Sequence, residues 1–254
     1  MKDTPILFTP ENAQKSHDES KTNTRRLTGL DEINKEPDRW RVQYLSDSGA
    51  LVMERGYQPG GLHEEWFGQC RWGGKGDRIW VREAFTYFEY QEPAKPRKYV
   101  RFEDLTPRQQ ASTIEQASHI GEDYLVYKGG GAMRSLSEWI YPHPIYEHCI
   151  GRFGKTIPAI HMPEWACRTW LDLLEVRVER LRDISEDDAK AEGCRPGDWE
   201  YENAEGSLTC LESFRCLWES IHGPGSWDLN PWVWVLSFRK IESKADARTR
   251  QENE

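Results

Sequence analysis

The residues best suited to chemistry form one polar run, Ser20–Arg26. The run combines the Lys21 amine and the hydroxyls of Thr22 and Thr24 with two guanidinium groups, and it contains no apolar side chain. Such a run cannot form part of a hydrophobic core, because its polar groups would lose their hydration without replacement. Two interpretations stay open at this point, a solvated surface loop or a polar functional site.

A second polar position lies far along the chain, at Glu192. The segment around it has the features of a short helix, since Ser185 can cap its start and Gly193 can end it in the left-handed conformation. Glu192 then falls in the last turn, near the packed face, where a carboxylate opposes the helix dipole. A carboxylate in such a place needs a partner, as functional acids do. The alternative is a solvated residue at a helix end.

The elements that must position these residues are mostly strands. Apolar and alternating patterns predict strands at 5–8, 40–44, 50–53, 78–85, 123–128, 169–181 and 232–238. Start signals and helical spacing predict helices at about 10–19, 183–193 and 211–221. On the long strand we expect one face to carry Leu174, Val176 and Val178. On the last helix we expect the buried residues to be Phe214, Leu217, Trp218 and Ile221.

Several short strands with few helices indicate an α+β fold built on a small mixed β-barrel with flanking short helices. We expect a single domain over residues 1–241, with long insertions at about 27–75, 86–154 and 194–209. Residues 242–254 are charged and are expected to form a disordered tail.

The overall charge limits the function. A net charge of −9 argues against wrapping a nucleic-acid backbone, which needs a cationic excess, but a single nucleotide or short strand in a local basic pocket is compatible with it. The chain has 12 Trp, whose rings suit a small core or a base-stacking surface.

Cysteine, histidine and apolar patterns indicate the setting. Six Cys without a CxxC pair predict a reduced, cytoplasmic protein without a disulfide framework. The spacing of His143, His148 and Cys149 matches no standard zinc pattern, so we expect no metal and no cofactor. The start of the chain lacks the apolar core of a signal peptide, and no segment has the roughly 18 apolar residues of a membrane span. We therefore expect no association with a membrane.

Four segments in order carry a resemblance to a known family. Lys21–Arg26 resembles the KTxTxR signature of the ASCH domain, a branch of the PUA-like β-barrels, and Gly76–Glu83 resembles its GDxLxV strand. Ile184–Gly193 resembles the family's short acidic helix ending in EG, and Trp232–Phe238 resembles its closing strand. The chain is also similar to uncharacterised ASCH-like proteins of tailed phages and prophages, which share the patterns KTxTRR, GDRLWVRE, IHMPRWASR and NPWVW.

This sequence departs from those relatives at two positions. Glu164 stands where they carry a basic residue, and Cys167 stands where they carry Ser. The resemblance implies a PUA-like barrel and, for a phage-encoded protein, the cytoplasm of the host cell.

The resemblance implies a specific activity. Some small ASCH proteins are amidohydrolases that remove the acetyl group from N4-acetylcytidine with a Lys, a Thr and a Glu, which fall here on Lys21, Thr24 and Glu192. A tight turn is expected to bring the amine and the hydroxyl together. A desolvated Lys21 has a lowered pKa and can take a proton from Thr24 or from water, and Glu192 orients it and returns a proton to the leaving amine. Arg26 is expected to stabilise the oxyanion or hold a phosphate.

The alternative class is a module that binds RNA or a modified base without catalysis. The cleft of such a module is expected to be lined by polar and aromatic residues from several segments, namely Thr22, Arg25, Arg26, Trp80, Arg82, Glu83, His161 and Arg168. Ribonuclease activity through Lys21 and Glu192 and binding of a host protein are further alternatives. The sequence does not indicate an oligomeric state.

Overall fold

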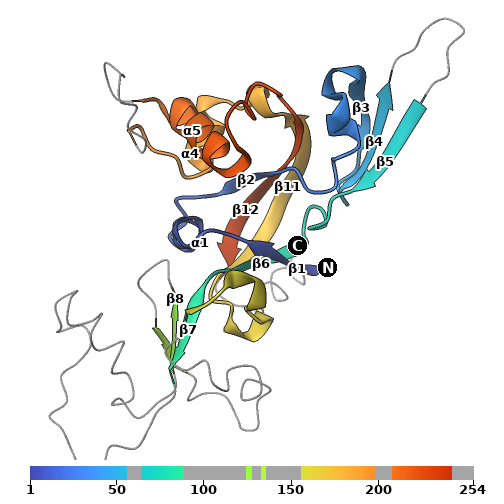
Figure 1. Cartoon of the computed structure of the whole chain (residues 1–254). Helices are drawn as coiled ribbons and strands as arrows, with labels where there is room; N and C mark the ends of the chain where they lie inside the picture. The colour runs from blue at the N-terminus through green and yellow to red at the C-terminus, as the bar shows by residue number, and fades with distance from the viewer. Residues whose placement is uncertain (56–63, 89–123, 128–132, 136–155, 198–207, 242–254) are drawn as a thin grey trace, which may run out of the picture. The chain divides into compact units, whose positions relative to one another are not determined.

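The computed structural model describes residues 1–55, 64–88, 124–127, 133–135, 156–197 and 208–241 (Figure 1). This part of the chain consists mainly of strands with few helices, which confirms the α+β class. The chain divides into two compact units, one made of residues 1–6, 15–81 and 168–254 and the other of residues 7–14 and 82–167. The single domain expected over 1–241 stays a prediction, and each unit is described by itself.

The core of the first unit is a five-stranded sheet. Its order is β1 (Asp3–Leu7), β6 (Arg78–Arg82), β11 (Trp170–Arg180), β12 (Trp232–Ile241) and β2 (Asn23–Arg26). The antiparallel pair β11–β12 is the longest and runs from Trp170 opposite Ile241 to Arg180 opposite Trp232. Among the described residues the sheet has two open edges, β1 and β2, and does not close on itself. The expected strands at 5–8, 169–181 and 232–238 are confirmed.

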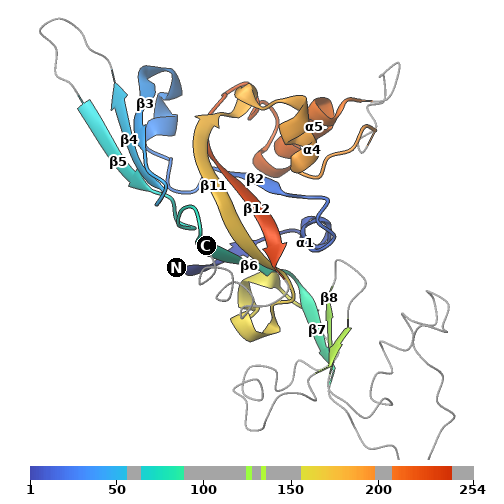
Figure 2. The same cartoon turned by 180° about the vertical axis from the view of Figure 1, so that it is seen from behind.

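The polar run becomes an edge strand of this sheet. β2 pairs with β12, with Thr24 opposite Leu236 and Arg25 opposite Val235, and both views show the two strands side by side (Figures 1 and 2). The preceding helix α1 (Pro10–His17) begins at a cap formed by Thr9, whose hydroxyl accepts a hydrogen bond from Asn12 N at 3.3 Å. The chain leaves α1 before the polar run begins.

A bulge in β11 changes which of its side chains share a face. The register with β12 shifts between Leu173 and Glu175, so the alternation changes phase there. Leu174 is consequently 42% exposed, whereas Leu171 and Leu173 are buried. The expectation that Leu174 shares the buried face with Val176 is therefore wrong.

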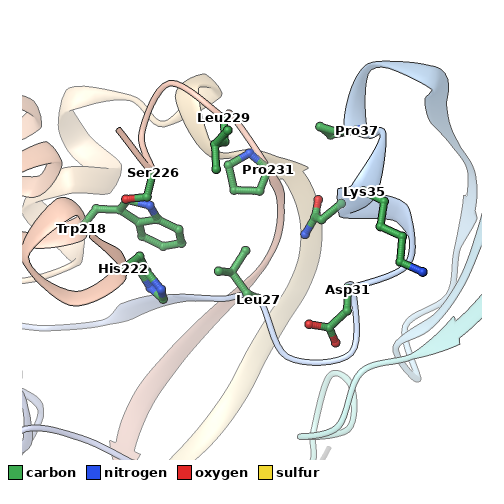
Figure 3. A pocket seen from close by; sticks show the side chains of 10 residues that line it. Leu27, Asp31, Lys35, Pro37, Trp218, His222, Ser226, Leu229 and Pro231 are labelled. Carbon is green, nitrogen blue, oxygen red and sulfur yellow. The ribbon is translucent and has the colours of Figure 1, made fainter. Parts of the chain in front are cut away.

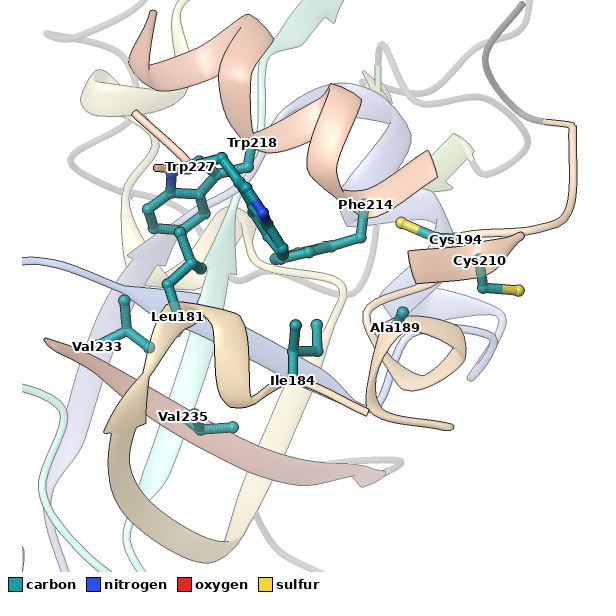
Figure 4. Packing of buried hydrophobic residues seen from close by; sticks show 10 residues of the cluster. All are labelled: Leu181, Ile184, Ala189, Cys194, Cys210, Phe214, Trp218, Trp227, Val233 and Val235. Carbon is teal, nitrogen blue, oxygen red and sulfur yellow. The ribbon is translucent and has the colours of Figure 1, made fainter. Parts of the chain in front are cut away.

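Helices α4 (Glu186–Ala191) and α5 (Cys210–His222) pack together beside β2. α4 begins at Ser185, whose hydroxyl accepts from Asp188 N, and ends at Glu192 before Gly193, which has a φ of 85°. Their apolar sides form one cluster with β12 (Figure 4), whose buried members are Leu181, Ile184, Ala189, Cys194, Cys210, Phe214, Trp218, Trp227, Val233 and Val235. Ile221 was expected in this core but is 56% exposed, because it lies in the last turn of α5 beyond the cluster.

The segment expected as the first insertion contains its own sheet. The hairpin strands β3 (Trp40–Leu45) and β4 (Ala50–Arg55) are confirmed, and β5 (Glu64–Gln69) extends them to three antiparallel strands. Two short 3₁₀ turns, Ile33–Lys35 and Pro37–Arg39, precede the hairpin.

The second unit contains a four-stranded sheet of order β10 (Thr156–Ile157), β7 (Phe85–Phe88), β8 (Tyr124–Tyr127) and β9 (Met133–Ser135). The strand expected over 78–85 is interrupted at Glu83 and Ala84, so that β7 begins a separate sheet. His143, His148, Cys149 and the tail expected over 242–254 lie outside the described residues. Within the described part of the chain, no helix has the length and apolar character needed to cross a membrane.

Candidate functional site

Three elements of the first unit bring a group of charged side chains together. β2 supplies Arg25, β11 supplies Glu179, and α4 ends at Glu192. Main-chain hydrogen bonds hold the entry to β2 in place, because Thr22 N donates to Ala191 O at 2.8 Å and Thr22 O accepts from Phe238 N at 2.8 Å. The start of β2 is thus tied to α4 on one side and to β12 on the other.

Lys21 and Glu192 form a buried ion pair. Lys21 Nζ lies 2.6 Å from Glu192 Oε2 and donates a second hydrogen bond to the Glu192 main-chain oxygen at 2.8 Å. The two residues are 2% and 3% exposed. The second contact places a cation at the C-terminal end of α4, where the helix dipole favours positive charge. The partner that we expected for Glu192 is therefore Lys21.

Arg25 contacts the carboxylate of this pair from the other side. Its Nη1 lies 3.1 Å from Glu192 Oε1, so that the two carboxylate oxygens of Glu192 face different cations. Its Nε and Nη2 donate to Glu179 Oε1 at 3.0 and 2.6 Å, and Nη2 also lies 3.1 Å from Asp188 Oδ2. The guanidinium packs over the ring of Phe214 at 5.7 Å from the centroid. Arg25 thereby contacts three carboxylates while its side chain is completely buried.

An outer ring of polar contacts surrounds Asp188. Asn23 Nδ2 donates to Asp188 Oδ1 at 3.0 Å, and Arg177 Nη2 donates to both oxygens of that carboxylate at 2.7 and 2.8 Å. Burial raises the pKa of Asp188, but hydrogen bonds from Arg177 and the charge of Arg25 outweigh it and hold the pKa below its usual range. Asp188 is therefore an anion at neutral pH.

The electrostatics of the buried pair favour proton transfer at Lys21. Burial lowers the pKa of Lys21 from its ordinary value, the carboxylate of Glu192 opposes this, and the charge of Arg26 lowers the pKa further. Burial also lowers the pKa of Arg26 to about 10, against the charge of Glu192, so Arg26 remains a cation at neutral pH. The pKa of Lys21 has thus moved toward the range useful for acid–base chemistry.

Thr24 lies apart from the ion pair. Successive side chains of a strand point to opposite faces, so Thr24, opposite Leu236, lies on the other face of the sheet from Arg25. The tight turn expected between Lys21 and Thr24 is replaced by the extended backbone of β2. In the described part of the chain, the Thr24 hydroxyl makes no hydrogen bond to Lys21 or Glu192.

The other expected binding residues are distributed over both units. In the first unit, Trp80 is buried in β6 opposite Trp170, Arg168 is half-buried beside β11, and Thr22 is exposed. In the second unit, Glu83 is completely buried and its amide donates to Met162 Sδ at 3.2 Å, and Arg82 Nη1 reaches Ile160 O at 3.4 Å. His161 is exposed in a short 3₁₀ turn of the same unit.

Sequence reasoning missed three members of the network, Glu179, Asp188 and Arg177. The signal was present, because Glu175, Arg177 and Glu179 alternate along one face of a predicted strand. Asp188 also precedes Glu192 by one helical turn, so both carboxylates project from the same side of α4. A helix face that carries two carboxylates, beside a strand face on which acidic and basic side chains alternate, indicates a network of ion pairs.

Comparisons with protein-family models, with curated proteins and with solved structures found no match to this chain.

Proposed function

We propose that this chain is an ASCH-like protein whose five-stranded sheet belongs to a PUA-like fold and whose site acts on a nucleoside. The proposed activity is hydrolysis of the amide of an N4-acylated cytosine, in a free nucleoside or in RNA. The observation that carries the proposal is the contact of Lys21 Nζ with Glu192 Oε2 at 2.6 Å. These residues are 171 positions apart and come from the two segments that resemble the reactive residues of that family.

The chemistry follows from the charges around the pair. Lys21, with its lowered pKa, takes a proton from water as the water oxygen attacks the acyl carbonyl. The charge of Arg26, which acts on both members of the pair, favours the developing oxyanion. The protonated Lys21, oriented by Glu192, returns the proton to the departing 4-amino nitrogen. The C–N bond breaks, and the products are the cytosine and a carboxylic acid. Because the pair is buried, the acyl group has to enter by displacing the direct contact between Lys21 and Glu192.

The test is turnover of N4-acetylcytidine by wild-type protein and by Lys21→Met/Glu192→Gln, followed by chromatography. Both charges leave together in this double variant, so no unpaired buried charge remains, and Arg25 keeps Glu179 and Asp188 as partners. We expect the rate to fall by at least about 100-fold, which is the typical contribution of a general acid–base group. Near-ultraviolet circular dichroism checks that the fold is retained.

The matched control removes an exposed ion pair of the same helix. Asp187→Asn/Lys190→Met deletes the contact of Lys190 Nζ with Asp187 Oδ1 at 3.0 Å and is expected to keep full turnover. Full turnover by the Lys21/Glu192 variant would show that the assignment of these residues is wrong. Absence of turnover by the wild-type protein would exclude this hydrolysis.

A second candidate function is a module that binds a base or RNA without catalysis. It is favoured by the completeness of the network, since each oxygen of Glu192 already faces a cation and the reactive groups are buried. In that case the network stabilises the fold, and Arg26 is the cation next to it that meets a phosphate. Arg26→Ala is then expected to weaken binding of a short RNA by about ten-fold in fluorescence anisotropy. Equal binding by wild type and variant would contradict this function.

A further inference from the structure

The first unit contains a pocket that includes none of the residues of the ion network. Its volume is about 380 Å³, within the range of roughly 300–1,000 Å³ that is usual for sites of small molecules. One wall consists of the end of α5 and the loop that follows it, and the facing wall consists of the segment 31–37 (Figure 3). Leu27, directly after β2, lies between the two walls.

The walls present flat and apolar surfaces. Trp218 and His222 lie with their ring centroids 4.1 Å apart and their planes at 35°, one helical turn apart on α5. Leu229 and Pro231 continue this surface, and Leu229 is 71% exposed although it is a large apolar residue. Covering such a side chain with an apolar ring is favourable, because it removes apolar surface from contact with water.

Two polar atoms in the same wall have no hydrogen-bond partner within the described chain. They are Nε1 of Trp218, a residue that is 4% exposed, and Oγ of Ser226. A buried polar group without a partner costs free energy, which a ligand recovers when it supplies the missing partner. The Ser226 hydroxyl can turn about a single bond to meet a ligand, and it can donate or accept.

Across the pocket, the exposed carboxylate of Asp31 provides a hydrogen-bond acceptor (Figure 3). His222 adds no positive charge at neutral pH, since burial and the nearby charge of Arg26 both lower its pKa. The pocket therefore offers apolar faces, donors on one wall and an anionic acceptor on the other.

We infer that this pocket binds a flat heteroaromatic ring that carries an amino group, of the size of one nucleobase. The ring lies against Leu27, Leu229 and Pro231, the amino group donates to Asp31, and an acceptor on the opposite edge meets the donors of Trp218 and Ser226. The inference does not rest on the proposed hydrolysis, because no residue of the Lys21–Glu192 pair lines this pocket.

The test is ligand-observed NMR with four nucleosides, two of which carry an amino group (cytidine and adenosine) and two of which carry a carbonyl in its place (uridine and inosine). We expect the amino nucleosides to bind at least ten-fold more tightly, because the carbonyl compounds direct an acceptor at the carboxylate. Asp31→Asn is expected to remove this preference, whereas Asp228→Asn, an exposed residue outside the pocket, keeps it.

A second pair of variants tests whether the nucleoside binds in this pocket. Leu229→Asp is expected to weaken binding by at least ten-fold, whereas Ile221→Asp, which changes another exposed apolar residue outside the pocket, leaves it unchanged. Absence of binding by all four nucleosides, or equal binding by the two variants, would overturn the inference. Lys21→Met/Glu192→Gln is expected to bind like wild type, so that a failed hydrolysis and a failed pocket are told apart.

Discussion

Arg25 is the residue on which the buried charges depend most. It faces Glu179, Glu192 and Asp188 at 2.6 to 3.1 Å while its own side chain is completely buried. Removing one partner of a buried pair leaves the other charge without compensation, which costs more than the pair itself contributes. We therefore expect Arg25→Met to lower the free energy of unfolding by about 3–5 kcal/mol in urea denaturation.

The matched control is Arg239→Met on β12. Arg239 pairs with Asp172 at 3.3 Å, but its side chain is 51% exposed, so its loss is expected to cost at most about 1 kcal/mol. A loss below about 1 kcal/mol for Arg25→Met as well would show that the three carboxylates do not require the guanidinium.

At the scale of the elements, the start of α5 is held by two acceptors of different origin. Thr209 forms a capping box with Glu212, and the carboxylate of Glu186 on α4 accepts from Cys210 N and Leu211 N at 2.9 and 3.0 Å. We expect Thr209→Ala to lower the free energy of unfolding by about 1 kcal/mol, the usual cost of a lost N-cap. Ser220→Ala at the other end of α5 is the control, and an equal effect of the two variants in urea denaturation would contradict the prediction.

The elements also show how far the sequence could predict this fold. β11, β12, α4 and α5 were predictable because apolar periodicity and capping residues are local signals. β2 was not, because its side chains are polar and its extended form depends on hydrogen bonds to β12, which lies more than 200 positions away. The bulge at Leu173 was equally hidden, since only the partner strand defines a register.

The same reasoning applies to the site. The sequence predicted that Glu192 needs a partner, and the resemblance indicated that this partner is Lys21. The place of Thr24 was not predictable, because it depends on the alternation of a strand that local patterns do not reveal. The pocket was hidden as well, since its walls combine the segment 31–37 with the loop after α5.

At the scale of the whole first unit, Arg26 links the ion pair to the pocket. Burial is the main cause that lowers the pKa of Lys21 and of His222, and the charge of Arg26 lowers both pKa values further. Because the folded pKa of His222 lies below its ordinary value of 6.5, the unfolded chain binds more protons as the pH falls from above 6.5. The contribution of His222 to stability is therefore fully present above pH 6.5 and is lost as the pH falls toward its folded pKa.

Arg26→Gln tests this link, because it removes the charge and keeps a polar side chain. We expect the pKa of His222 to rise toward 6.5 in an NMR titration of the imidazole resonances, which His222→Gln assigns. The unfolding free energy should then depend less on pH below 6.5, since the folded and unfolded pKa values come closer together. Arg177→Gln removes a cation that pairs with Asp188 instead, so it is expected to leave the His222 titration unchanged. Identical His222 titrations in wild type and Arg26→Gln would mean that the charge of Arg26 does not act on the pocket. A ligand bound in the pocket would then not change the pKa of Lys21 through Arg26.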